Sequence, residues 1–404
     1  MNQAETMLTL EEALSLILAQ IPATQGTRAD LEQSNGRFLT TSICSTIDLP
    51  PFDNSGMDGY AVRSEDVLTA SQENPVLLKL LGRVPAGTVF EGEVQRGQCV
   101  RVFTGSPLPR GTNAVVMQED TRIEHPGEVS ILEPAKPFDY VRLQGEDVRA
   151  GTQIAKAGSR ISPATIGLMG ACGIGSVEVG PLPRMALLAT GSELLEPGEH
   201  LTPGKIHESN RLMLASLSSE VGVSTNIYPL VKDDLLATKE ALETAFSNSD
   251  FVVTSGGVSV GEMDYVKAGF EKMGGKLQFW KIAMRPGKPF VFGTWKDKFL
   301  FGLPGNPVST FVTFLLLVRP ALLKFQGAVE TGLSTQHGIL NESVSNAGPR
   351  RHFIRVFIDP SGIIMPSGTQ TSHMLSSLAK ANGLLDMPPE IKLKQGQRVT
   401  VLRF

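Results

Sequence analysis

The sequence is poor in cysteine: only Cys44, Cys99 and Cys172 occur among its 404 residues. They are scattered, odd in number and never form a CxxC pair, so neither a disulfide framework nor a zinc knuckle is indicated. Long apolar runs are also lacking. The most apolar stretch, Phe311 to Val318, is followed by Arg319-Pro320, which we expect to end it well short of the length that spans a bilayer.

Neither sign of charge dominates the composition. Lysine and arginine total 37 against 41 for aspartate and glutamate. This balance gives no reason to expect wholesale binding to nucleic acid or to an anionic membrane, and an anionic ligand would need a local basic cluster. The first residues lack the basic start and apolar run of a signal peptide. We therefore expect a soluble, cytoplasmic protein.

The pattern of apolar residues and turns changes twice along the chain, and the length of the chain predicts several domains. Residues 1–180 are rich in short apolar runs and tight turns, which predicts a β-rich N-terminal region of two subdomains. Residues 181–326 alternate strands with helices, which predicts βαβ units and a parallel sheet covered on both faces. Residues 327–404 return to short strands and are expected to form a C-terminal β domain. A first helix, capped by Thr9 with Glu12, is expected to pack on the central domain.

Ligands of an open parallel sheet bind beyond the carboxyl ends of its strands, and the first loop expected there follows the apolar strand 185–189. In this loop, Gly191 lets the backbone approach a ligand closely, and Glu193 adds a carboxylate. The alternative is a tight turn with a solvated glutamate.

The second loop, residues 254–262, follows the strand 251–253 and contains Ser255, Gly256 and Gly257. Gly256 and Gly261 have the spacing of a phosphate-binding P-loop, but Glu262 occupies the position where that motif needs lysine, which disfavours a Walker-type ATPase. Asp264 is close enough to carry a metal that bridges to a phosphate. Its alternative role is that of a favourable acid in the first turn of a helix.

A basic segment follows, in which Lys281, Arg285 and Lys288 lie among two prolines and a glycine. A stiff cationic turn suits a small tetrahedral oxyanion, because rigid donors lose little entropy on binding. A solvated basic turn is the alternative. Farther on, the segment 302–309 supplies a turn and Ser309 near the start of a helix predicted over 308–323, another plausible site for an anion.

A polar cluster also lies in the β-rich first part of the chain. Asp58 precedes Gly59, and the pairs Thr104-Gly105 and Glu146-Asp147 follow other short strands. Each of these residues is either a turn residue or one that faces a ligand, and the local pattern does not separate the two.

Taken together and in order, these segments resemble the MoeA family, whose eukaryotic relatives include the C-terminal region of gephyrin. The resemblance covers almost the whole chain and rests on the segments 53–61, 104–105, 145–147, 190–194, 255–261 with 264–265, 285–289 and 302–309. It implies a multidomain α/β plus β fold: β-rich N-terminal domains, a central molybdopterin-binding domain with a parallel sheet, and a C-terminal β-barrel-like domain. It also implies an elongated homodimer in which the partner's N-terminal part contributes to the active-site cleft.

The activity implied is a magnesium-dependent molybdenum transfer, in which molybdate and adenylylated molybdopterin react and AMP leaves. By residue-for-residue match, the acidic positions that ligate Mg²⁺ or orient its water would be Glu193, Asp233 and Asp264. The basic positions would be Lys281, Arg285 and Lys288, of which the first two join the acids as catalytic residues. Further substrate-binding positions would be Asp58, Thr104, Arg142, Asp147, Gly191, Ser255, Gly256, Gly257, Pro304, Asn306 and Ser309. The expected protein partners are the molybdopterin adenylyltransferase and molybdoenzyme maturation factors.

Two other functions are weighed against this one. A non-catalytic scaffold is conceivable because a gephyrin-like relative clusters receptors, but the chain keeps the acidic site residues that a scaffold could lose. A nucleotide-pyrophosphate hydrolase could share the central fold alone. Arg285 also departs from the lysine that many bacterial relatives carry, and its planar guanidinium could change the geometry around an oxyanion.

Overall fold

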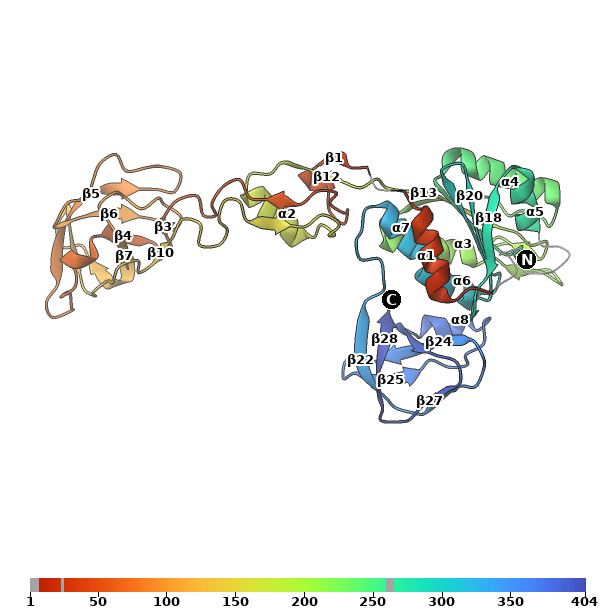
Figure 1. Ribbon diagram of the computed structural model, residues 1–404. Coiled ribbons are helices and arrows are strands. Elements are labelled where there is room, and N and C mark those ends of the chain that lie inside the picture. The colour runs from red at the N-terminus through yellow and green to blue at the C-terminus, as the bar shows by residue number, and fades with distance from the viewer. Residues whose placement is uncertain (1–6, 23–24, 259–264) are drawn as a thin grey trace.

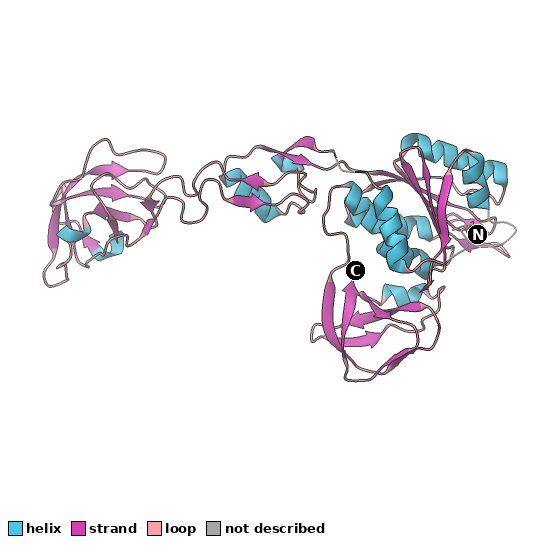
Figure 2. Cartoon of the chain, viewed as in Figure 1, coloured by secondary structure: helices cyan, strands magenta, loops and turns pink. Residues whose placement is uncertain are grey.

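The protein is described here by a computed structural model, which covers residues 7–22, 25–258 and 265–404. The chain is elongated (Figure 1), with a β-rich distal module (residues 54–142) at one end and a central domain (184–325, with the first helix) at the other. A small middle module (27–44 and 153–179) lies between them, and a C-terminal domain (335–403) lies beside the central domain. Helices gather around the central sheet, whereas strands dominate the other parts (Figure 2). The predicted combination of α/β and β architecture is confirmed.

A six-stranded sheet with the order β7-β4-β6-β5-β9-β8 forms the distal module. Apolar side chains fill both of its faces, in two separate clusters, because successive residues of a strand point to opposite sides. The strands are β4 (Gly59–Val62), β5 (Val76–Val84), β6 (Gln98–Val102), β7 (Ala114–Met117), β8 (Thr121–Arg122) and β9 (Glu128–Ile131). The pair β3 (Asn54–Ser55) and β10 (Val141–Arg142) completes the module.

Two short antiparallel pairs and one helix form the middle module. The chain crosses this module twice, because each pair joins a strand from before the distal module to one from after it. The elements are β1 (Thr27–Asp30) with β12 (Ser176–Val179), β2 (Ile43–Cys44) with β11 (Gln153–Ala155), and α2 (Pro163–Ala171).

The central sheet has the order β16-β13-β17-β21-β20-β18. Its strands are β13 (Arg184–Ala189), β16 (Ser224–Ile227), β17 (Phe251–Ser255), β18 (Lys276–Lys281), β20 (Pro289–Trp295) and β21 (Lys298–Leu303). The first four in this order are parallel, as predicted, but β20 is antiparallel to both of its neighbours. A two-residue turn at Lys296 and Asp297 joins β20 to β21, and so short a connection permits only an antiparallel pair.

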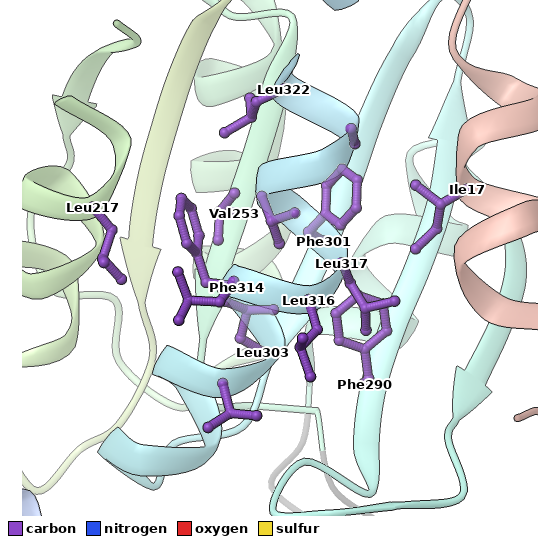
Figure 3. Packing of buried hydrophobic residues seen from close by; sticks show 14 of the residues in the cluster. Ile17, Leu217, Val253, Phe290, Phe301, Leu303, Phe314, Leu316, Leu317 and Leu322 are labelled. Atoms are coloured by element: carbon purple, nitrogen blue, oxygen red, sulfur yellow. The ribbon is translucent and has the colours of Figure 1, made fainter. Parts of the chain in front are cut away.

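Helices cover both faces of this sheet. One face packs on α4 (Leu235–Asn248) and α5 (Tyr265–Lys272), and the other on α3 (Asn210–Glu220) and on the long helix 307–325. The first helix, α1 (Leu10–Gln20), joins the second of these layers through Ala13 and Ile17, and its capping box of Thr9 and Glu12 is formed. Figure 3 shows side chains of the long helix meeting those of the sheet and of α1.

The long helix is built from α6 (Pro307–Thr313), a π-helical turn (Phe314–Val318) and α7 (Arg319–Phe325). The helix predicted over 308–323 is confirmed: Arg319-Pro320 interrupts the apolar run in the sequence, but the helix continues through it. The wider π turn just before the proline eases its clash with the preceding turn. Among the described residues, only this helix has the length and hydropathy of a membrane span, and 83% of its most apolar stretch is buried inside the protein. It is packed as a core helix.

The C-terminal domain is a nearly closed sheet of the order β19-β24-β25-β22-β28-β26, with an additional pairing of β24 and β26. Its strands are β22 (Thr335–Leu340), β24 (Arg351–Ile358), β25 (Ile363–Pro366), β26 (Gly383–Met387) and β28 (Arg398–Arg403). A separate pair is formed by β23 (Val344–Asn346) and β27 (Ile391–Leu393), and α8 (Leu375–Ala379) covers one end. The strand β19 (Met284–Arg285) comes from the central domain, so the basic segment links the two domains.

Candidate active site

The strand order of the central sheet arranges the predicted loops along one edge. Asp233 follows β16, Glu193 follows β13, Gly256 follows β17 and Pro304 follows β21. The turn that carries Lys288 enters β20 at the same edge, because β20 runs in the opposite direction. Acidic loops therefore lie at one end of this edge, the glycine-rich loop lies in the middle, and the basic turn lies at the other end.

The two acidic loops are tied to each other. The amide of Ser192 donates to Oδ2 of Asp233 at 2.7 Å, and the amide of Asp233 donates to the Ser192 hydroxyl at 3.3 Å. Glu193 folds back over Gly191, so that a Cβ added at this glycine would lie 2.7 Å from Oε2 of Glu193. Two carboxylates, Glu193 from the loop after β13 and Asp233 from the loop after β16, thus lie against the backbone of residues 191–192.

Two consecutive glycines follow β17 and adopt the left-handed region of backbone space, with φ of +85° at Gly256 and +65° at Gly257. A Cβ at Gly256 would lie 2.6 Å from the carbonyl oxygen of Thr190, and one at Gly257 would lie 2.6 Å from the Thr190 hydroxyl. Only glycine meets both the conformation and the close approach to the neighbouring loop. This explains the Gly-Gly pair without reference to phosphate.

Two adjoining cavities open at this edge. The acidic cavity, of about 650 Å³, is lined by Glu193, Asp233 and the loops after β13 and β17. The basic cavity, of about 440 Å³, is lined by Arg285, Lys288, Arg350 and a loop of the C-terminal domain. The two cavities share four wall residues: Pro289, Pro304, Asn306 and His373.

The wall behind the basic cavity is itself strongly cationic. His352 pairs with Arg285 across β24 and β19, is only 6% exposed, and lies near Arg350 and the fully buried Arg355. Burial, reinforced by the charges of these three arginines, lowers the pKa of His352 to about 4. The imidazole is therefore neutral at physiological pH, and the positive charge of this wall comes from the arginines.

This shift predicts a loss of stability in mild acid. Between a pKa of about 6.5 in the unfolded chain and about 4 in the folded one, only the unfolded chain binds the proton. Burial of the neutral His352 therefore contributes up to about 3 kcal/mol to the free energy of unfolding. This contribution is complete above the upper pKa and is lost as the pH falls through the window. Urea unfolding of the wild type and of His352→Gln at pH 7.5, above the window, and at pH 4.5, near its lower end, measures the effect. The difference between the two proteins should change with pH; an equal acid loss in both would contradict the assignment to His352.

Most of the predicted site residues meet at the two cavities. Glu193, Asp233, Gly191, Ser255, Gly256 and Gly257 line the acidic one, Arg285, Lys288 and Ser309 line the basic one, and Pro304 and Asn306 line both. Asp264 lies outside the described residues. Lys281 lines neither cavity, and its ammonium group lies 3.6 Å from the centre of the Trp280 ring.

Four predicted residues lie in or beside the distal module, away from these cavities within one chain (Figure 1). They are Asp58, Thr104, Arg142 and Asp147. Thr104 donates to Oδ1 of Asp58 from its amide at 2.8 Å and from its hydroxyl at 2.9 Å, and these two bonds lower the pKa of the Asp58 carboxyl. Arg142 lies in β10, next to the β3 strand that leads toward Asp58.

Several lining residues were not found by sequence reasoning. Asn210, the first residue of α3, lines the acidic cavity and donates from Nδ2 to the Ser255 hydroxyl at 2.7 Å and to the carbonyl oxygen of Gly305 at 2.8 Å. Arg350 and the polar run 370–373 line the basic cavity. The run of polar residues after Gly368 is the one signal in the sequence that pointed to this loop.

The comparisons with known proteins agree with this arrangement. Residues 8–173 match the MoeA N-terminal region (domain I and II), residues 186–324 a probable molybdopterin binding domain, and residues 337–404 the MoeA C-terminal region (domain IV). A molybdopterin molybdenumtransferase from Haemophilus influenzae is 35% identical over 98% of this chain and 99% of its own length. One from a Nostoc species is 37% identical over 93% of this chain and 88% of its own. The crystal structure of a molybdopterin biosynthesis MoeA protein from Pyrococcus horikoshii OT3 superposes with a TM-score of 0.83, at 32% identity, over 99% and 100% of the two chains.

The fold and the cavities at the edge of its central sheet thus define an enzyme of molybdenum cofactor biosynthesis that is built around a molybdopterin-binding domain. The whole chain, from the N-terminal modules to the C-terminal barrel, belongs to the MoeA family of molybdopterin molybdenumtransferases. The predicted resemblance is confirmed.

Proposed function

We propose that this enzyme transfers molybdenum from molybdate to the dithiolene of adenylylated molybdopterin, in a magnesium-dependent reaction that releases AMP. The observation that carries the proposal is the order of charge along one sheet edge, with carboxylates at one end of two adjoining cavities and cations at the other. Adenylylated molybdopterin carries both a diphosphate and a pair of sulfurs. Its reaction therefore needs the acidic cavity, beside the diphosphate, and the basic cavity, which holds the molybdate that the sulfurs attack.

The acidic end suits the diphosphate through a divalent cation. No group of three His, Cys, Asp or Glu side chains that could hold a metal occurs among the described residues. Mg²⁺ fits nonetheless, since it is commonly bound by one or two carboxylates together with waters and substrate phosphates. Glu193 and Asp233 would hold it here, joined in our proposal by Asp264, and when bound it would neutralise the diphosphate oxygens. Glu193 and Asp233 would thus act on the diphosphate through the cation that they hold, while water attacks the P–O–P bond.

The basic end suits molybdate. Arg285 and Lys288 approach the cavity from the turn before β20, and Arg350 approaches it from the C-terminal domain. Cations on two domains can surround a tetrahedral dianion, and guanidinium groups bind oxyanions through paired hydrogen bonds. Lys281 remains a weaker member of this set in our proposal, because it does not line the cavity. The soft sulfurs of the dithiolene, and not protein cysteines, receive the molybdenum.

The test is to incubate the purified protein with adenylylated molybdopterin and Mg²⁺, with and without molybdate, and to measure AMP and pterin-bound molybdenum. We expect AMP release to depend on molybdate and to match the molybdenum transferred. Hydrolysis that ignores molybdate would instead identify a nucleotide-pyrophosphate hydrolase. Removal of Mg²⁺ by a chelator should stop both products.

We further propose that the enzyme is a homodimer whose cleft is completed by Asp58, Thr104, Arg142 and Asp147 of the partner. The distance of the distal module from the cavities within one chain supports this assembly (Figure 1), because a two-fold pair of elongated chains can bring each distal module to the other's central domain.

Complementation between inactive chains tests this arrangement. Asp58→Asn and Glu193→Gln should each strongly lower turnover alone, whereas dimers that contain one chain of each kind keep one intact cleft. With random pairing, co-expression should restore about a quarter of the wild-type activity. Mixed dimers without activity would show that Asp58 and Glu193 serve the same chain.

We also propose that the reaction takes place in the cytoplasm, with the adenylylated pterin supplied by an adenylyltransferase and the product passed to maturation factors.

A further inference from the structure

The wall shared by the acidic and the basic cavity contains one residue that can carry a proton. Of its four members, Pro289, Pro304 and Asn306 have no titratable side chain, and only His373 does. His373 also differs from the other three in belonging to the C-terminal domain, on the loop just before α8.

The backbone fixes the position of this loop. The amide of Val308, in the first turn of α6, donates to the carbonyl oxygen of Ser372 at 3.2 Å, which ties the loop to the edge of the central sheet. Gln370, earlier in the loop, donates to the carbonyl oxygen of Arg355 at 3.0 Å. His373 is therefore held at the junction of the cavities by bonds that do not use its own side chain.

The imidazole itself is available for chemistry. Its side chain is exposed, and within the described part of the chain it forms no hydrogen bond or ion pair. Charged or titratable groups line the two cavities that His373 joins: Arg285, Lys288 and Arg350 on the basic side, and Glu193, His207, Glu208 and Asp233 on the acidic side. Neutral imidazole can accept a proton at one nitrogen and donate one from the other, which is the property a proton carrier needs near neutral pH.

The proposed reaction requires such a carrier. When a dithiol reacts with molybdate, two S–H bonds and one Mo–O bond break, and two Mo–S bonds and the two O–H bonds of a water form. No oxidation or reduction occurs, and the charge of −2 is conserved. The protons must travel from the sulfurs to the departing oxygen, and the cations of the basic cavity cannot accept them because they are already protonated.

We propose that His373 is a catalytic residue of this transfer, which takes a proton from a dithiolene thiol and gives it to the oxygen that leaves molybdate as water. This inference rests on the proposed function. It gives the wall shared by the two cavities a role that differs from the role of the acidic end and from that of the basic end. The carboxylates would hold a divalent cation beside the diphosphate, the cationic side chains hold the oxyanion, and His373 moves the protons between the two reactants.

The test compares His373→Gln and His373→Ala with the wild type in molybdenum transfer. We expect kcat to fall by about 100-fold, as for the loss of a general acid–base, while the KM for molybdate stays within about twofold. The pH profile of the variants should differ from that of the wild type, because only the wild type transfers protons through this side chain. Added imidazole should partly restore the alanine variant, because the side chain it replaces is exposed.

The matched control is His337→Gln, an exposed histidine on β22 that bonds to Thr400 and lines neither cavity; its rate should equal that of the wild type. A large rise in the KM for molybdate with an unchanged pH profile would overturn the proposal in favour of a purely structural role, and so would normal turnover of His373→Ala. A failure of the proposed function is distinguishable, because then the wild type itself would show no molybdate-dependent AMP release.

Discussion

Replacing Glu193 by glutamine should lower the rate of AMP release on the order of 100-fold, the scale on which a group that stabilises developing charge is felt in an active site. Glutamine keeps the size of the side chain, which folds over Gly191, but removes the charge that faces the acidic cavity. The measurement is AMP formed in a single turnover at saturating molybdate, repeated over a range of magnesium concentrations. Higher magnesium should recover part of the lost rate, because the remaining carboxylate of Asp233 still offers a weaker site.

The control for this variant is Glu243→Gln. Glu243 lies on α4 in the same domain, is exposed and pairs with Lys239 at 3.1 Å, so its change removes the same charge at a position that lines neither cavity. It should leave the rate unaltered. If Glu193→Gln released AMP at the wild-type rate at every magnesium concentration, Glu193 would have no role in metal binding. A melting temperature lowered in both variants would show that the loss of rate comes from impaired folding and not from the loss of a metal ligand.

The acidic half of the site was predictable because its signals are local. A buried strand followed by a glycine and a carboxylate identifies the loop of Glu193, and the glycine pair after β17 identifies its neighbour. Parallel strands bring their carboxyl ends to one edge, so recognising the strands was enough to predict that these loops meet. The helix boundaries were predictable for the same reason, since capping residues and apolar periodicity act within a few residues.

The basic half could be predicted only in part. The segment around Arg285 was interpreted as a loop, but it contains the short strand β19, which pairs with β24 of the C-terminal domain. That pairing joins residues far apart in the sequence and brings Arg350 and His373 to the cavity. Nothing local in Arg350 or His373 shows which distant strand will lie beside them, because strand pairing depends on the whole sheet. The antiparallel course of β20 was missed for a related reason, as its apolar run fits either direction.

The distal residues mark a different limit. Asp58 and Thr104 were both visible as polar residues beside glycines in the sequence, although the bonds between them join positions 46 residues apart. What these residues face depends on a second chain, and a pattern within one chain carries no information on how two chains are placed. The complementation experiment supplies the missing information.

At the other end of the cavities, Lys288→Ala should raise the molybdate concentration that gives the half-maximal rate by about 10-fold to 100-fold, the range expected when a charged group loses its hydrogen bond to an anion. The rate at saturating molybdate should change little, because the carboxylates at the acidic end are untouched. Arg350→Ala should behave in the same way although it lies in another domain, since both side chains line the basic cavity. Steady-state rates over a range of molybdate concentrations measure both effects.

Two lysines of β18 provide the comparison. Lys276, at the start of the strand, lies at the opposite end of β18 from Lys281 and lines neither cavity, so Lys276→Ala should leave the molybdate requirement unchanged. Lys281 lies near the basic turn, but its ammonium stacks on Trp280. Lys281→Ala should therefore have a smaller effect than Lys288→Ala if the cavity wall holds the oxyanion. An effect of Lys281→Ala as large as that of Lys288→Ala would mean that Lys281 leaves the indole ring when molybdate binds. If Lys288→Ala and Arg350→Ala both left the molybdate requirement unchanged, the basic cavity would not be the molybdate site.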